Sequence, residues 1–254
     1  MPEAVIVSTA RSPIGRAMKG SLTTIRPDEL AAQIVDAALA KIPALDRNQV
    51  EDLLMGCGQP AGESGVNIGR VVAVLAGMPE VPGVTVNRYC SSSLQTIRMA
   101  AHAIKAGEGD VFVAAGVETV SRFINGMADD GPANERCAEA MARTASRAAG
   151  EGGAWAPPAG LPDVYIAMGQ TAENVAEFEQ VGRQEQDEFA AQSQQRATES
   201  LENGYWEMEI TPVTLPDGTV VKNDDGIRPG TTAEGLSGLK PVFKNGQVIA
   251  EGKH

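Results

Sequence analysis

The 254-residue sequence is poor in histidine, cysteine and aromatic residues, and these shortages exclude several kinds of protein. Its three cysteines, Cys57, Cys90 and Cys137, are too few and too widely spaced for a disulfide framework or a structural zinc site. Its two histidines, His102 and His254, leave little choice of a general base. No run of about 18 apolar residues occurs, so the sequence predicts no membrane-spanning segment.

Acidic residues outnumber basic ones, and the net charge is −12. Such a surface disfavours nucleic acids and anionic membranes as partners. The first residues, MPEAVIVSTARSP, read as a short strand and lack the charged, apolar and cleavage regions of a signal peptide. We therefore expect a cytoplasmic protein.

Segments typical of strands and helices alternate over the first 120 residues. The predicted strands cover 4–9, 53–55, 84–87 and 111–115, and the predicted helices begin at 27, 67 and 91. This alternation predicts an α/β domain with a mainly parallel sheet and crossover helices.

The pattern changes after residue 120. Helices are predicted over 135–149 and 183–203, a loop over 150–162, and a hairpin around Pro216-Asp217-Gly218. Residues 223–240 are rich in glycine and show little periodicity. We expect two domains, an α/β domain over 1–120 and a loop-rich α/β insertion over 121–254 that ends with a return to the core.

The segment around Cys90, VTVNRYCSSSLQTIRMAAHAIKAG, is the most informative about chemistry. A strand ends near Tyr89 and a helix follows at once, which places Cys90 at or just before a helix N-terminus. Free N–H groups and the helix dipole stabilise a thiolate there. The alternative is a buried structural cysteine, but the polar neighbours Asn87 and Arg88 favour a reactive thiol. Cys57 and Cys137 lack such surroundings, and we expect them to be structural.

A thiol nucleophile usually needs a base within hydrogen-bond reach. His102 lies twelve residues after Cys90 on the same predicted helix, about 18 Å along its axis, so it cannot serve the thiol. His254 is the last residue and cannot be placed. Either the helix terminus does all the activation, or the base lies outside this chain.

Four ordered segments resemble the thiolase family. They are residues 86–122 around the cysteine, the opening VIVSTARSPIGR (5–16), MGQTAENVA (168–176) and DDGIRPGTTAEGLSGLKPVF (224–243). The string CSSSL also resembles ketoacyl synthases, which share the fold, but VNRY and MGQTAENVA favour thiolase. The resemblance implies a thiolase-like mixed sheet with crossover helices.

The resemblance also implies a reaction. Cys90 would carry an acyl group during thiolytic cleavage of 3-ketoacyl-CoA, or during Claisen condensation of acetyl-CoA, and its backbone N–H would help form an oxyanion hole. Met168 would line the acyl pocket, Arg228 would meet the nucleotide end of coenzyme A, and Val242 and Phe243 would flank its adenine or pantetheine. Coenzyme A would be a substrate, with no permanently bound cofactor and no metal.

The chain departs from the family pattern in two ways. Ala167 stands where biosynthetic members often have a histidine, which favours a wider acyl pocket or a degradative role such as β-oxidation. The chain also ends where the family enters a second α/β half, which carries an activating histidine and an acid–base cysteine. We therefore expect this chain to be incomplete for turnover. The resemblance also implies a homodimer or homotetramer. The alternatives are an acyl-CoA-binding module without catalysis and a ketoacyl-synthase-like condensing enzyme.

Overall fold

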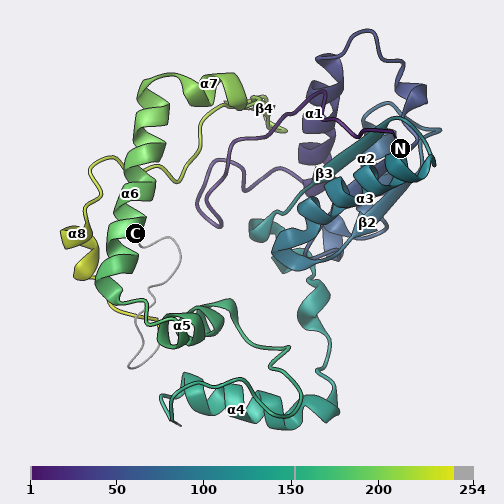
Figure 1. Cartoon of the computed structure of the whole chain (residues 1–254). Helices are drawn as coiled ribbons and strands as arrows, with labels where there is room; N and C mark the ends of the chain where they lie inside the picture. Colours follow the sequence, from purple (N-terminus) through teal and green to yellow (C-terminus); the bar gives the residue numbers. More distant parts are fainter. Residues whose placement is uncertain (1, 152, 243–254) are drawn as a thin grey trace. The chain divides into compact units, whose positions relative to one another are not determined.

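A computed structural model describes residues 2–151 and 153–242 (Figure 1). The chain forms two compact units, Met1–Asp130 with Gly204–Gly226, and Gly131–Asn203 with Ile227–His254. Each unit is described by itself below. The sequence placed Gly204–Gly226 in the later domain, whereas here this segment belongs with the first unit. The domain boundary at residue 120 stays a prediction.

The first unit is built on a three-stranded sheet with the order β2-β1-β3. The strands are β1 (Asp52–Gly56), β2 (Gly83–Val86) and β3 (Phe112–Gly116). Both strand pairs are parallel, and Leu53 is in register with Gly83 on one side and with Val113 on the other. The predicted α/β fold is confirmed, as are the strands predicted near 53, 84 and 111.

Helices cover both faces of this sheet (Figure 1). Pro27 opens α1 (Pro27–Ala40), with Asp28 and Glu29 in the first turn as predicted. The apolar faces of α1 and α2 (Ile68–Leu75) pack against one face of β1 and β3 and form the main hydrophobic core. Members of this core include Val35, Leu53, Met55, Ile68, Val72 and Met78.

The other face of the sheet meets α3 (Ser92–Ala106). Its buried Thr96 donates a hydrogen bond to the carbonyl oxygen of Ala115 in β3 at 3.2 Å. The first unit also contains the 3-10 turns η1 (Arg47–Gln49), η2 (Gly62–Ser64), η3 (Tyr89–Ser91), η4 (Val120–Asn125) and η5 (Ala128–Asp130), whereas η6 (Glu135–Cys137) belongs to the second unit.

The strand predicted over residues 4–9 is wrong for this structure. No strand is assigned there within the described residues, and the side chains of Val5, Ile6 and Val7 are 66–76% exposed. Arg11 makes a single parallel bridge with Ile210. β-Branched residues favour a strand only where a neighbouring strand accepts their hydrogen bonds, and the described residues supply none to 4–9.

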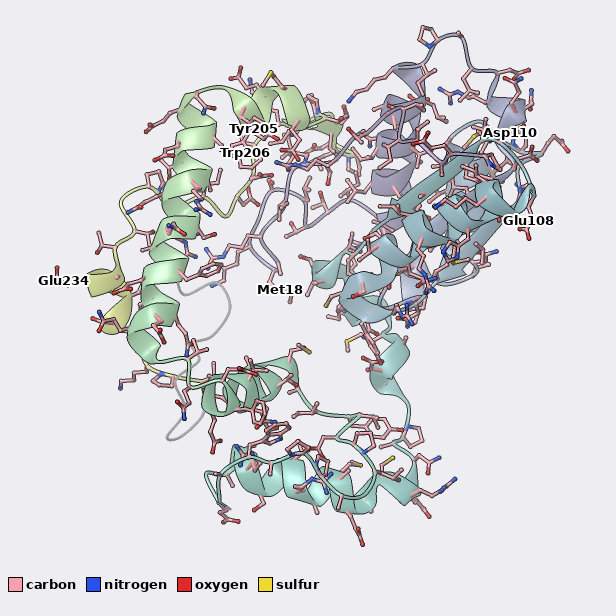
Figure 2. All side chains as sticks on the ribbon, in the orientation of Figure 1. Met18, Glu108, Asp110, Tyr205, Trp206 and Glu234 are labelled. Atoms are coloured by element: carbon pink, nitrogen blue, oxygen red, sulfur yellow. The ribbon has the colours of Figure 1, made fainter. Side chains whose placement is uncertain are left out.

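The opening segment is tied to Gly204–Gly226. Arg11 forms a two-pronged ion pair with Asp224 at 2.9 and 3.1 Å. Its guanidinium lies 5.1 Å from the ring centre of Trp206. Trp206 belongs to α7 (Tyr205–Glu209) and is labelled in Figure 2. Asp225 accepts hydrogen bonds from the N–H groups of Arg16 and Ser21, both at 2.8 Å. Two of the segments that carry the family resemblance are therefore joined.

The hairpin predicted around Pro216-Asp217-Gly218 is present but short. It consists of β4 (Val213–Thr214) and β5 (Val220–Val221), which pair in antiparallel fashion.

The second unit is helical. It contains α4 (Ala138–Ala148), α5 (Met168–Phe178), α6 (Arg183–Glu202) and α8 (Ala233–Ser237). The helices predicted near 135–149 and 183–203 are confirmed, whereas α5 and α8 were not predicted. Arg147 joins α4 to α5 through Asn174 at 3.2 Å and Glu177 at 2.7 Å. Among the described residues, no helix is both long and apolar enough to cross a membrane.

Candidate active site

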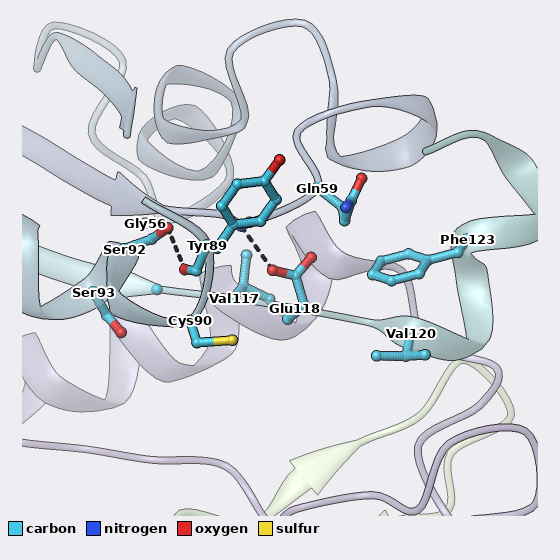
Figure 3. Close-up of a pocket in the computed structure, with 12 residues that line it drawn as sticks. Gly56, Gln59, Tyr89, Cys90, Ser92, Ser93, Val117, Glu118, Val120 and Phe123 are labelled. Atoms are coloured by element: carbon cyan, nitrogen blue, oxygen red, sulfur yellow. Dashed lines mark hydrogen bonds between the residues drawn. The ribbon is translucent and has the colours of Figure 1, made fainter. Parts of the chain in front are cut away.

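The carboxyl ends of three parallel strands meet at one edge of the sheet, where α/β proteins commonly bind ligands. An open pocket of about 460 Å³ lies at this edge (Figure 3). Its lining comes mainly from the residues that end or directly follow β1, β2 and β3. The lining residues are Gly56, Gly58, Gln59, Tyr89, Cys90, Ser92, Ser93, Gly116, Val117, Glu118, Val120 and Phe123.

Cys90 occupies the turn between β2 and α3, as the sequence predicts. It is the middle residue of η3, and α3 begins two residues later at Ser92. The residue is exposed, and it lines the pocket (Figure 3). The first turn of α3 carries backbone N–H groups without partners in the helix, which favour a negative charge nearby.

The turn that presents Cys90 is strained and braced. Tyr89 has a φ of +46°, a conformation that costs a non-glycine residue about 1–3 kcal/mol and persists only where the surroundings impose it. The side chain of Asn87 accepts a hydrogen bond from the Tyr89 N–H at 2.9 Å. The Ser92 hydroxyl accepts from the Arg88 N–H at 2.8 Å and donates to the Tyr89 carbonyl at 2.6 Å. Ser92 thus braces the turn at both ends.

Two glycines let α3 begin directly on the strand ends. Gly56 and Gly116 are paired across β1 and β3. A Cβ atom on Gly56 would lie 2.5 Å from the Ser93 nitrogen, and one on Gly116 would lie 2.6 Å from the Ser93 Cβ atom. Because both distances are far below van der Waals contact, any side chain here would displace the start of the helix. The sequence analysis missed this pair, although a glycine at a strand end marks a close backbone approach.

Glu118 places a carboxylate in the pocket, and the sequence analysis missed it. One oxygen accepts a hydrogen bond from the Gly58 N–H at 2.7 Å, and the other lies 3.9 Å from the Cys57 sulfur. Burial raises the pKa of the Cys57 thiol to about 11, and the charge of Glu118 adds to the rise. Cys57 therefore stays a neutral thiol near pH 7. The signal for Glu118 was its position directly after a parallel strand.

No histidine lines the pocket among the residues that the structure describes. His102 lies in α3, ten residues after its first residue, which corresponds to about 15 Å along the axis. His254 lies outside the described residues. The pocket thus exposes a thiol beside a helix N-terminus, an arrangement that favours a nucleophilic thiolate.

Three of the other predicted site residues lie in the second unit. Met168 is the first residue of α5 and is 70% exposed. The N–H of Arg228 donates to the side-chain oxygen of Gln194 at 2.8 Å. Val242 is about half exposed, and Phe243 lies outside the described residues. Since each unit is described by itself, the roles of these residues toward Cys90 stay predictions.

Comparison with known proteins identifies relatives along nearly the whole chain. Residues 4–252 match the family described as thiolase, N-terminal domain. The 3-ketoacyl-CoA thiolase of Bacillus subtilis (strain 168) is 39% identical, and the alignment covers 98% of this chain and 62% of that protein. The beta-ketoadipyl-CoA thiolase of Acinetobacter baylyi is 42% identical, with the same two coverages.

Solved structures give the same picture. The dimeric peroxisomal thiolase of Saccharomyces cerevisiae superposes with a TM-score of 0.79 at 32% identity, over 95% of this chain and 58% of that one. The acetyl-CoA acetyltransferase of Bacillus anthracis gives a TM-score of 0.76 at 31% identity, over 97% and 61%. The chain thus spans about 60% of the length of the relatives that it matches.

Proposed function

The chain belongs to the thiolase family, and we propose that it carries the nucleophile of a site that transfers acyl groups to and from coenzyme A. The observation that carries the proposal is the exposed Cys90 thiol, held in a strained turn at the N-terminus of α3 and open to a pocket.

In the degradative direction, the Cys90 thiolate attacks the 3-keto carbon of a 3-ketoacyl-CoA. The bond between C2 and C3 breaks, its electron pair stays on C2, and a proton delivered there completes acetyl-CoA. The remaining acyl group is left as a thioester on Cys90. The thiolate of a second coenzyme A attacks this thioester, which releases the shortened acyl-CoA and restores the Cys90 thiolate. The reverse sequence is the Claisen condensation.

The geometry of the turn suits these steps. Negative charge develops on the carbonyl oxygen at each attack, and the backbone N–H of Cys90 would donate to it. The start of α3 favours both that charge and the thiolate. Gly56 and Gly116 bring the helix against the strand ends, so the substrate meets backbone and small side chains here.

The contacts to coenzyme A are proposals. Met168 would line the acyl pocket, Arg228 would pair with a phosphate, and Val242 and Phe243 would flank the pantetheine or adenine. Coenzyme A acts as substrate, without a permanently bound cofactor. A base for Cys90 would come from residues outside those described. We further propose a homodimer or homotetramer in the cytoplasm.

Thiolysis of acetoacetyl-CoA by the full-length gene product tests the proposal. The unmodified protein should form acetyl-CoA when coenzyme A is supplied, and Cys90→Ser should abolish this. Cys137→Ser is the matched control, since this thiol lies outside the pocket lining, and it should retain activity. Binding of acyl-CoA without turnover would support the non-catalytic alternative. Turnover only with an acyl carrier protein would support the ketoacyl-synthase-like one.

A further inference from the structure

Asp129 joins three segments around the pocket through hydrogen bonds. It lies in η5, and its Oδ1 atom accepts from the phenol of Tyr89 at 3.2 Å. Its Oδ2 atom accepts from the side-chain Nε2 of Gln59 at 2.6 Å. The Gln59 Oε1 atom in turn accepts from the N–H groups of Ala128 and Asp129, at 2.7 and 3.3 Å. The loop after β1, the Cys90 turn and η5 are therefore tied together.

Asp129 supplies the two acceptor atoms of this link. The phenol of Tyr89 donates to Asp129, and so does the amide nitrogen of Gln59. Gln59 cannot rotate its amide to become an acceptor, because its oxygen already accepts from two backbone N–H groups. An asparagine at 129 could keep both hydrogen bonds, because its oxygen can accept from Gln59 and its NH₂ group can donate to the phenol oxygen of Tyr89. Asp129→Ala removes both acceptor oxygens and breaks the link.

Tyr89 needs such a tether more than an ordinary residue does. It has positive φ and directly precedes Cys90, so a change in its backbone angles moves the nucleophile. Its side chain is 60% exposed and so lies at the surface of the unit. Asn87 and Ser92 hold its backbone, whereas Asp129 holds the end of its side chain. A strained residue persists only where its surroundings hold it in place, and here both the backbone and the phenol of Tyr89 are held.

We propose that Asp129 is a positioning residue for the nucleophile, acting through Tyr89 and together with Gln59. The proposal rests on the proposed acyl transfer at Cys90. Asp129 itself does not touch the reacting sulfur; it fixes the turn from which the sulfur attacks. Its loss therefore slows formation of the acyl enzyme and leaves the affinity for acyl-CoA unchanged.

The test is the rate of Cys90 acetylation by acetyl-CoA in the full-length protein, followed by quenched-flow mass spectrometry over a range of acetyl-CoA concentrations. Tyr89→Phe and Asp129→Ala should each lower the saturating rate about tenfold, as expected for losing a hydrogen bond to a charged group. The concentration for half-saturation should not change. The double variant should be no slower than the slower single one, because both changes remove the same tether.

Asp130→Ala is the matched control. It removes the same charge one residue away, where the carboxylate accepts from the Met127 N–H at 3.2 Å, and it should keep the wild-type rate. If the wild-type protein acetylates normally and Tyr89→Phe and Asp129→Ala acetylate at the same rate, the positioning role is refuted. The role would also be refuted if the two single effects on the rate multiplied in the double variant. It would be refuted too if the loss of rate in each variant were explained by its unfolded fraction alone. Absence of acetylation in the wild-type protein would instead overturn the proposed function.

Discussion

Replacing Gly116 by alanine should disable the nucleophile while leaving the fold in place. The new Cβ atom would lie 2.6 Å from the Ser93 Cβ atom. Carbon atoms pack at about 3.5–4.0 Å, so the first turn of α3 must retreat by roughly 1 Å. Since Cys90 lies three residues before Ser93, the sulfur moves with it. A misplacement of about 1 Å can cost up to 100-fold in rate, so we expect a 10- to 100-fold loss, on the order of 1.4–2.7 kcal/mol.

The assay is the rate of Cys90 acetylation per folded molecule, with the folded fraction taken from circular dichroism. Gly83→Ala is the first control: its Cβ atom would crowd the Arg70 nitrogen at 2.5 Å, away from the pocket. It should destabilise the protein without lowering the acetylation rate per folded molecule. Gly131→Ala is the second control, because nothing lies within 4 Å of its Cβ position. A Gly116→Ala protein that acetylates at the wild-type rate would refute the reasoning.

Three further predictions concern stability. Burial raises the pKa of Asp52, and one of its oxygens is buried without a hydrogen-bond partner; its stabilising contribution is therefore present at low pH and lost as pH rises. Asp52→Asn should raise the free energy of unfolding, measured in urea at pH 7, by up to about 1 kcal/mol. This increase should shrink toward pH 4. Burial alone would raise the pKa of Asp225, but hydrogen bonds from Arg16 and Ser21 outweigh it and lower that pKa. Asp225→Asn should therefore lower the free energy of unfolding by about 1 kcal/mol at neutral pH. The difference between variant and wild type should disappear as pH falls below about 4, and a difference that does not change with pH would contradict the assignment. Arg11→Lys should lose about 1 kcal/mol in thermal unfolding, because lysine cannot form the two-pronged pair; an unchanged midpoint would show that the pair contributes nothing.

Local patterns allowed the sequence to predict the α/β fold, the three strands of the sheet and the position of Cys90. The segment 4–9 was predicted wrongly, because its composition is typical of a strand but no strand among the described residues lies beside it. Contacts between residues far apart in the sequence could not be predicted either, because local patterns do not encode them. Glu118 meets Gly58 from 60 positions away, and Tyr89 meets Asp129 from 40 positions away. The folded chain alone shows that these side chains meet.

The central claim is that Cys90 holds the acyl group, and peptide mass spectrometry tests it most directly. The full-length protein is mixed with acetyl-CoA, quenched in acid and digested, and the peptide that spans residues 84–107 is fragmented. We predict an acetyl group on Cys90 that disappears when coenzyme A is added before the quench. No acetyl group on Cys90, or an acetyl group that coenzyme A does not remove, would contradict the account.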